Sequence, residues 1–355
     1  MVPENSPSLG RYSLPASLPG SELGGGVASG ETLKSKEPPM GIHHITAIAG
    51  DPQRNLDFYS GLLGLRLVKL TVNFDDPASY HLYYGDEIGR PGSILTFFPW
   101  PGGQRGRQGT GQIATVALAV PPGALGFWIE RLLSQGIKYE GPSRRFDEQV
   151  LAFKDPDELL LELVATAGAA EAVPWAEGPV PAEHAIRGLH GATIWEDGDR
   201  GTAQLLTETL GFEAADEAGG LHRFQSKQEG LGTVVNLRKA PGFWRGAGGV
   251  GTVHHMAFRA ATDQEQLEKR STIEDLGLAI TPVIDRQYFH SVYFREPGGV
   301  LFEIATDGPG FAIDESVAEL GSHLQLPPMY QSDRPAIERA LPPLRLPHAA
   351  ARETT

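Results

Sequence analysis

The sequence of 355 residues contains no cysteine. This absence excludes disulfides, thiolate zinc sites, iron–sulfur clusters and cysteine nucleophiles, so any metal ion must be held by His, Asp or Glu. Long apolar runs are also absent: the longest, such as residues 94–98, are far shorter than the roughly 20 residues of a membrane-spanning helix. Basic residues are outnumbered by acidic ones, 30 to 44, which argues against a nucleic-acid-binding surface. We therefore expect neither a membrane nor a nucleic acid as a partner.

The first 39 residues show no export pattern. They are rich in Pro, Gly and Ser, with no charged start followed by an apolar stretch. We expect residues 1–39 to be a disordered leader, and the protein to be cytoplasmic. Overall, 40% hydrophobic and 21% charged residues are typical of a globular chain, and the length suggests about two domains.

Four segments of the chain resemble one another, beginning near residues 41, 112, 188 and 252. Each starts with a short strand-like run, which is followed by a stretch with apolar residues at helical spacing. The predicted helices are 55–64, 125–136, 203–211 and 266–277, and each ends in a glycine, as a left-handed C-terminal cap favours. Further strand-like runs follow, at 65–72, 80–84 and 94–98 in the first copy and at 279–284, 289–294 and 300–305 in the fourth. The sequence therefore predicts an α+β fold of four βαβββ modules.

Two copies carry a His-His pair in their first strand. The second histidines of these pairs are His44 and His255, and the fourth copy ends in an apolar strand that contains Glu303. Because successive strand residues point to opposite faces, we expect one histidine of each pair to face a shared interior and its neighbour to point elsewhere. Two histidines and one carboxylate are the ligand set of non-haem Fe(II), and Mn(II) could use the same ligands. A cation would also offset the cost of burying the glutamate.

The other two copies lack this ligand set. Glu162 aligns with Glu303, but the third copy has Gly191 in place of the second histidine and the second copy has no histidine there. We therefore expect modules one and four to form the metal cup, and Glu162 to be a structural carboxylate in a cup of modules two and three. In the first copy the same alignment places Phe97 opposite Glu303.

Several motifs carry a family resemblance. They are GIHHIT at 41–46, TVNFDDP at 71–77, VHHMAF at 253–258 and DRQYFHSVYFREPGGVLFEIAT at 285–306. Over about residues 40–335 the chain resembles the vicinal oxygen chelate superfamily, and within it the dioxygenases that cleave the ring of hydroquinones. The resemblance implies two cup-shaped half-barrel sheets with outer helices, and an Fe(II) extradiol-type site between modules one and four.

The resemblance also implies roles for individual residues. Tyr293 could donate a hydrogen bond to an oxygen at the metal, Arg286 could stabilise a phenolate, and His43 or His254 could move a proton. Because Arg286 and Tyr293 are seven residues apart, a bend near Gln287 is needed to place both in one site. The implied ligands are His44, His255 and Glu303, the surrounding catalytic positions are His43, His254, Arg286 and Tyr293, and the substrate contacts are Thr46, His290, Phe243 and Trp244. For the last two, an apolar lid and simple loop packing are the alternatives.

The sequence thus predicts an Fe(II)-dependent ring-cleaving dioxygenase of aromatic compound degradation, acting with O₂ on a hydroquinone-like or catechol-like substrate. One alternative is a glyoxalase-like isomerase or lyase, which Phe97 disfavours because such sites add a fourth protein ligand. The other alternative is a non-catalytic small-molecule binding protein of the same fold. The three metal ligands argue against it, because such proteins generally lack them. A homo-oligomer is left open. The predicted organisation is a leader at 1–39, a first domain at 40–168, a linker at 169–186, a second domain at 187–310 and a C-terminal tail at 311–355. Within the tail, we expect residues 327–330 and 342–347 to be extended over the surface.

Overall fold

A computed structural model describes residues 40–228 and 230–346. The predicted disordered leader lies outside these residues. Within them, no helix is both long enough and apolar enough to span a membrane.

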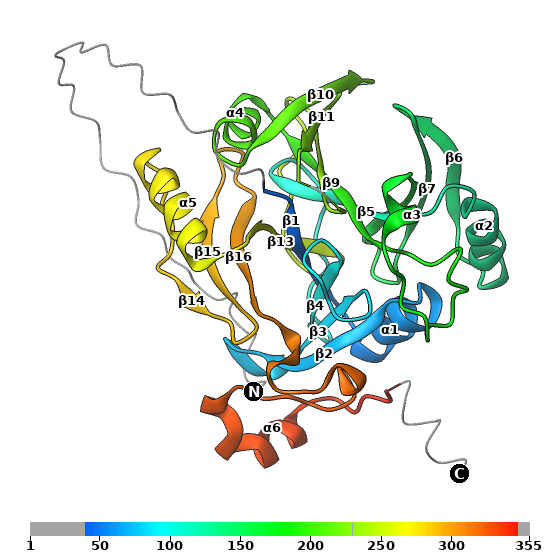
Figure 1. Ribbon diagram of the computed structural model, residues 1–355, viewed down its shortest axis with the longest axis vertical. Coiled ribbons are helices and arrows are strands. Elements are labelled where there is room, and N and C mark those ends of the chain that lie inside the picture. Colours follow the sequence, from blue (N-terminus) through cyan, green and yellow to red (C-terminus); the bar gives the residue numbers. More distant parts are fainter. Residues whose placement is uncertain (1–39, 229, 347–355) are drawn as a thin grey trace, which may run out of the picture. The chain divides into compact units, whose positions relative to one another are not determined.

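The described residues form two eight-stranded sheets (Figure 1). The first sheet contains β1 (Ile42–Ala49), β2 (Arg66–Asn73), β3 (Asp76–Gly85), β4 (Ile94–Pro99), β13 (Thr252–Ala260), β14 (Ile284–Asp285), β15 (Phe289–Arg295) and β16 (Leu301–Pro309). The second contains β5 (Gln112–Val120), β6 (Tyr139–Arg145), β7 (Glu148–Lys154), β8 (Leu160–Ala165), β9 (Gly188–Glu196), β10 (Phe212–Ala218), β11 (Leu221–Ser226) and β12 (Val234–Lys239). Their orders are β14-β15-β16-β13-β1-β4-β3-β2 and β10-β11-β12-β9-β5-β8-β7-β6. Modules one and four share the first sheet and modules two and three the second, and the predicted α+β fold class is confirmed.

The helix after each first strand also follows the prediction. These helices are α1 (Pro52–Leu56) with the π-helical turn η1 (Asp57–Leu62), α2 (Leu125–Ser134), α4 (Arg200–Glu208) and α5 (Asp263–Asp275); a short α3 (Gly168–Glu171) lies in the predicted linker. The strand predicted at 279–284 is wrong, because only the two-residue β14 forms there. Pro282 interrupts the run, since proline cannot donate a ladder hydrogen bond.

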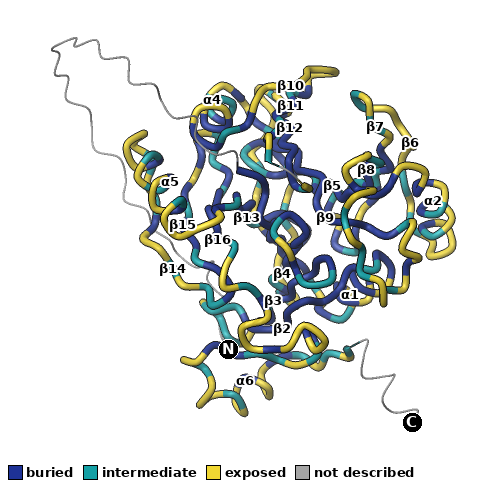
Figure 2. Tube along the Cα trace, viewed as in Figure 1, coloured by how far each residue is buried: buried dark blue, intermediate teal, exposed yellow. Residues whose placement is uncertain are grey.

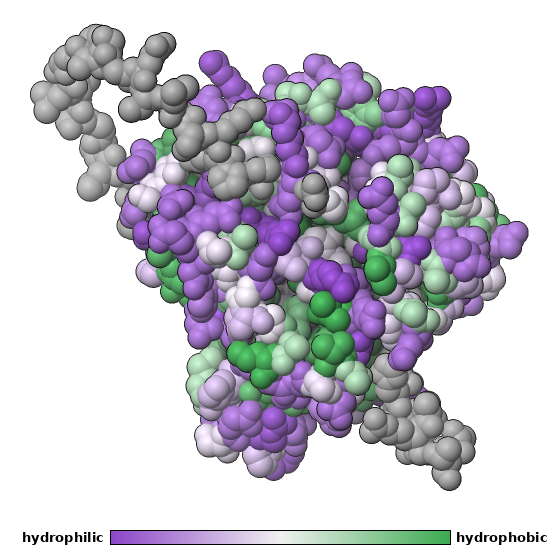
Figure 3. Space-filling view, in the orientation of Figure 1, coloured by the Kyte–Doolittle hydropathy of each residue, from purple (hydrophilic) through white to green (hydrophobic). Residues whose placement is uncertain are grey.

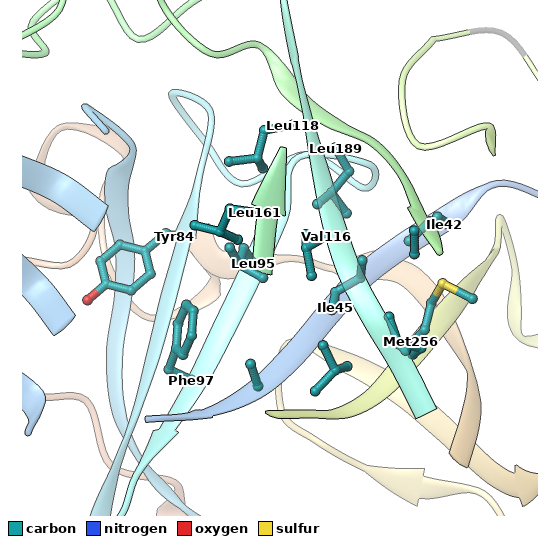
Figure 4. Packing of buried hydrophobic residues seen from close by; sticks show 14 of the residues in the cluster. Ile42, Ile45, Tyr84, Leu95, Phe97, Val116, Leu118, Leu161, Leu189 and Met256 are labelled. Carbon is teal, nitrogen blue, oxygen red and sulfur yellow. The ribbon is translucent and has the colours of Figure 1, made fainter. Parts of the chain in front are cut away.

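The core lies where the central strands of the two sheets meet. Side chains of β1, β4 and β13 pack there against those of β5, β8 and β9 (Figure 4). Ile45, Met256, Val116 and Leu189 belong to this cluster and are almost fully buried. Figure 2 shows that the central strands are buried, whereas the outer strands β10 and β6 are more exposed. Because each half of the chain meets the other through this core, the domain bounds 40–168 and 187–310 stay a prediction.

Two buried glutamates also join the modules. Glu296, in the turn between β15 and β16, accepts hydrogen bonds from Thr202 Oγ1 and from the backbone N–H groups of Gly298 and Val300. Glu196, at the end of β9, is only 1% exposed. Burial and the charge of Glu296 raise the pKa of Glu196 to about 8, so this carboxyl is protonated near neutral pH.

This raised pKa gives a pH-dependent prediction. The folded chain keeps the Glu196 proton between the ordinary pKa of about 4.5 and about 8, whereas the unfolded chain releases it. The resulting stabilisation is therefore complete below pH 4.5 and is lost as the pH rises to 8. Denaturant unfolding at pH 5.5 and 8 should show a decrease for the wild type that Glu196→Gln lacks. An exposed control, Glu208→Gln, should follow the wild type, and equal slopes for both variants would contradict the assignment.

The segment after β16 is only in part the extended tail that was predicted: the stretch at 327–330 enters a 3-10 helix, whereas residues 342–346 form neither helix nor strand. It contains η2 (Phe311–Ile313), η3 (Val317–Glu319), η4 (Pro328–Asp333) and α6 (Arg334–Ala340). We call residues 310–326 the strap. Phe311, Leu320 and Leu326 of the strap are buried, and Gln325 N–H donates to Leu70 O of β2 at 2.9 Å. Apolar residues gather on the face shown in Figure 3 in the region of β2 and the strap.

Candidate metal centre

Both His-His pairs lie at β-bulges in the pairing of β1 with β13. Ile42 is opposite Phe258 and His44 is opposite Ala257, so His43 is an extra residue. In the same way His254 is extra between Val253 and His255, which are opposite Ala47 and Thr46. A bulge sets two residues against one, so neighbouring side chains can face the same side. The expected alternation within each pair is therefore wrong: both histidines of each pair lie close together.

The structure brings the three predicted ligands together. His255 Nε2 lies 2.9 Å and His44 Nε2 lies 3.4 Å from Glu303 Oε2, and the two Nε2 atoms are 3.4 Å apart. All three residues are buried, Glu303 completely. Adjacent ligand atoms of an octahedral ion, at bonds of about 2.1 Å, lie roughly 3 Å apart. The three atoms therefore match one face of such an octahedron, the arrangement that leaves further positions open.

The environment of Glu303 also fits a cation. Ser291 Oγ donates to its Oε1 at 2.6 Å, while Oε2 lies between the two histidine nitrogens without a hydrogen bond of its own. Burial opposes ionisation, but the nearby histidines outweigh it and hold the pKa of Glu303 well below its usual value. A buried anion with one oxygen aimed at two imidazoles is a donor set for a divalent metal.

The first histidine of each pair lies within hydrogen-bond distance of the second through its Nδ1 atom. His43 Nδ1 lies 2.9 Å from His44 Nδ1, and His254 Nδ1 lies 2.7 Å from His255 Nδ1. Burial and the adjacent histidine lower the pKa values of His43 and His254 to about 3, so both are neutral and can accept a hydrogen bond. When the ligand histidine donates from Nδ1, its Nε2 presents a lone pair to the metal.

Arg286 and Tyr293 meet in the same site. Gln287 between them has φ 66°, which provides the bend that the sequence required. Arg286 Nε donates to Tyr293 OH at 3.3 Å, and the guanidinium lies 5.5 Å from the centre of that ring. Burial and Glu303 raise the pKa of Tyr293, so its hydroxyl remains a hydrogen-bond donor. The ring lies 5.7 Å from that of His255.

Two further polar residues, Thr96 and His81, lie beside the predicted substrate residue Thr46, and of these sequence reasoning missed Thr96. Thr96 Oγ1 lies 2.9 Å from Thr46 Oγ1 and 2.8 Å from His81 Nε2, and the His81 ring packs against Tyr83 at 3.9 Å and Phe98 at 4.2 Å. Burial, followed by nearby positive groups, holds the pKa of His81 well below its usual value. The predicted substrate residue Thr46 is thus joined to a cluster of hydroxyl, imidazole and aromatic groups.

The alignment of Phe97 with Glu303 is wrong by one residue. Thr46 pairs with Thr96 just as Ala257, the matching residue of module four, pairs with Glu303. The turn before β4 is one residue shorter than its counterpart, and a one-residue slip moves a side chain to the other face. Phe97 accordingly packs against Tyr59 at 4.4 Å, on the side of the helix. The position equivalent to Glu303 still holds no carboxylate.

Three residues that were predicted to contact the substrate, His290, Phe243 and Trp244, instead contact other parts of the chain. His290 Nδ1 pairs with Asp263 at the start of α5 at 2.6 Å, because strand alternation turns it away from Ser291 and Tyr293. The position of His290 therefore does not favour a substrate contact. Phe243 packs against Trp195 and Trp244, and the Trp244 indole donates to Gln108 O at 2.8 Å. These are contacts of a packed loop, and the lid role of both rings stays a prediction.

The second sheet repeats the same geometry without the ligands. Its bulged residues are Ala114 and His190, so Thr115 occupies the position of His255 and Gly191 that of His44. Glu162 is held by Arg145, with contacts of 2.9 and 2.7 Å to its two oxygens. A Cβ on Gly191 would lie 2.1 Å from Val234 O, so no side chain fits there. Arg145 supplies the positive charge that a metal would supply in the first sheet.

Comparisons with known proteins agree with this geometry. The family model of the Glyoxalase/Bleomycin resistance protein/Dioxygenase superfamily matches residues 41–163 and 196–304. The chain is 48% identical over 307 residues to "Putative ring-cleaving dioxygenase MhqO" of Bacillus subtilis, covering 86% of this chain and 97% of that protein. It is 33% identical over 319 residues to "Chlorohydroquinone/hydroquinone 1,2-dioxygenase" of Sphingobium indicum, covering 87% and 98%.

Solved structures extend the comparison. A crystal structure titled as a putative dioxygenase from Bacillus subtilis superposes with a TM-score of 0.84 at 46% identity, covering 87% of this chain and 99% of that one. A mutant glyoxalase I of Zea mays, at 16% identity and a TM-score of 0.58 over 76% and 92% of the two chains, shares the fold. The chain belongs to the Glyoxalase/Bleomycin resistance protein/Dioxygenase superfamily, on the branch of its ring-cleaving dioxygenases.

Proposed function

We propose that this protein is an Fe(II)-dependent, extradiol-type dioxygenase that opens the ring of a hydroquinone-like or catechol-like phenol. The observation that carries the proposal is the buried triangle of His44 Nε2, His255 Nε2 and Glu303 Oε2, which offers a metal three ligands on one side only. Mn(II) could occupy the same ligands. The relatives that are named as ring-cleaving dioxygenases support the reaction type.

When bound, Fe(II) would supply the redox coupling between an electron-rich ring and O₂. The residues of the chain position the reactants and control charge. His43 and His254 keep the ligand histidines in the metal-binding tautomer. Arg286 stabilises negative charge on a phenolate oxygen, and the Tyr293 hydroxyl donates a hydrogen bond to it. Because both groups are held by the protein before substrate binds, they need little rearrangement.

The wall of the cup favours an aromatic substrate. Phe289 packs at 5.1 Å from the His44 ring, and Tyr83 and Phe98 enclose His81. These faces suit a flat ring, while His81, Thr96 and Thr46 offer donors and acceptors for its hydroxyl groups.

Oxygen uptake tests the proposal. Protein reconstituted anaerobically with Fe(II) should consume O₂ only with a phenol present, and the aromatic absorbance should disappear at the same time. A panel of hydroquinones and catechols would rank the substrates. Tight metal binding with no uptake on any of them would contradict the proposal and favour an isomerase or lyase.

Tyr293→Phe should lower kcat about 100-fold, since it removes one fixed donor to developing negative charge. Fe(II) content should not change, because the hydroxyl is not a ligand. The matched control is Tyr330→Phe, whose hydroxyl donates to Phe74 O in the region of the strap. Steady-state kinetics together with iron analysis check this prediction; equal kcat values for both variants would exclude a role for the Tyr293 hydroxyl.

A further inference from the structure

The strap joins β2, one edge strand of the metal-binding sheet, to the turn between β14 and β15 near the other edge. Strands β14 and β2 are the edge strands of that sheet. On one side, Gln325 N–H donates to Leu70 O of β2. On the other, Gly310 N–H donates to Tyr288 O at 2.8 Å, just before β15. The strap therefore links residues that are far apart in the sheet and in the sequence.

Asp314 makes the polar contacts of this link, because its two carboxylate oxygens bind groups of β2 and of the turn between β14 and β15. Its Oδ1 accepts from Lys69 Nζ of β2 at 2.6 Å. Its Oδ2 accepts from Gln287 Nε2 at 2.7 Å and from Tyr288 OH at 2.9 Å. Lys69 is fully buried and also pairs with Glu315. The buried ammonium group of Lys69 on β2 thus fixes the carboxylate that holds two consecutive residues of the turn between β14 and β15.

Those two residues directly follow Arg286. Gln287 is in the left-handed region, which a residue with a side chain adopts only when its surroundings hold it there. The backbone of the turn is closed by Arg286 N–H to Phe289 O at 3.0 Å and by Tyr288 N–H to Arg286 O at 2.8 Å. The direction of the Arg286 side chain therefore depends on a turn that Asp314 anchors, and also on Asp75, whose Oδ2 accepts from Arg286 Nη1 at 3.4 Å.

The second sheet contains the same turn without this anchor. Arg145 is followed by Phe146 with φ 53°, as Arg286 is followed by Gln287. There the arginine points to Glu162, the equivalent of Glu303, and its strand β6 is largely exposed. The turn alone thus permits an arginine to reach the carboxylate of its own cup.

We propose that Asp314 is a positioning residue: it ties the Gln287–Tyr288 turn to Lys69 and keeps the Arg286 guanidinium beside Tyr293. This inference rests on the proposed function, in which Arg286 stabilises a phenolate. Asp314 acts through the turn and does not itself contact the reacting atoms.

The test uses binding without turnover. Metal-loaded protein is titrated anaerobically with 4-nitrocatechol, and the Kd is read from its absorption. Asp314→Ala and Gln287→Ala should each raise Kd about tenfold, and KM should change more than kcat. Glu319→Gln, an exposed carboxylate in the strap that accepts from Ser316, should leave Kd unchanged. In an Arg286→Ala background, Asp314→Ala should have less than about a twofold effect, because the path through Arg286 is already lost.

A second readout does not depend on substrate. Hydrogen exchange of a peptide covering 284–290 should become faster in Asp314→Ala, while exchange of β13 stays as in the wild type. If the metal-loaded wild type does not bind 4-nitrocatechol, the exchange rates alone decide whether Asp314 anchors the turn, and the proposed function is judged separately by oxygen uptake on the substrate panel. Wild-type Kd and exchange in both variants would overturn the inference. If Asp314→Ala does not fold, Gln287→Ala decides the question, since it leaves the Lys69–Asp314 pair intact.

Discussion

Glu303→Gln is expected to lower the affinity for Fe(II) by at least about 100-fold and to remove oxygen uptake. The substitution keeps the shape of the side chain but replaces the anionic ligand with a neutral amide. Even residues that only support metal ligands typically contribute about 10- to 100-fold to affinity, so loss of the single carboxylate ligand should exceed that range. Anaerobic iron titration followed by metal analysis measures the effect. His44→Ala and His255→Ala should give the same result.

Glu162→Gln is the matched control for this prediction. Glu162 occupies the equivalent register position in the second sheet, where it faces Arg145 and no histidine ligand. The variant should retain both iron and activity, although it loses some stability because the Arg145 charge is left unbalanced. Loss of iron in Glu162→Gln, with iron retained in Glu303→Gln, would mean that the metal lies in the other cup.

Lys69→Met is expected to lower the free energy of unfolding by about 3–5 kcal/mol, the usual cost of removing one partner from a buried ion pair. Lys69 Nζ is fully buried between Asp314 and Glu315, and lies 5.0 Å from the centre of the Tyr288 ring. Methionine would fill the volume but leave both carboxylates without their cation. Urea unfolding measures this loss, and the dependence of the free energy of unfolding on urea concentration should keep the same slope.

The control for this substitution is Lys154→Met. Lys154 pairs with Glu158, and both side chains are more than half exposed. Such surface pairs contribute less than about 1 kcal/mol. Similar losses for the two variants would show that the Lys69 network does not hold the strap to the sheet.

The modules and the metal ligands could be predicted because they repeat. Two His-His pairs at equivalent positions and a carboxylate in an apolar strand indicate one shared site, even without knowledge of how the strands pair. The bulges at His43 and His254 could not be predicted, since a bulge is a property of two paired strands. The misplacement of Phe97 has the same origin, because turn length sets the register and a one-residue error changes the face.

Contacts between residues far apart in the sequence were the second feature that the sequence could not predict. The bend at Gln287 was expected because Arg286 and Tyr293 must meet, but its anchor was not. Asp314 and Lys69 are far apart in the sequence, and the strap, which consists of short turns, gives no periodic signal for such a contact. For His290, strand alternation counted from Glu303 and Tyr293 would have shown that its side chain faces α5.

The central claim is that the cup of His44, His255 and Glu303 supports ring cleavage by O₂. Its most direct test is mass spectrometry of the product formed from a hydroquinone under labelled oxygen, with Fe(II)-loaded protein. The account predicts a ring-opened product that has gained both atoms of one O₂ molecule, and no such product from Glu303→Gln. A product without label, or with an intact ring, would contradict it.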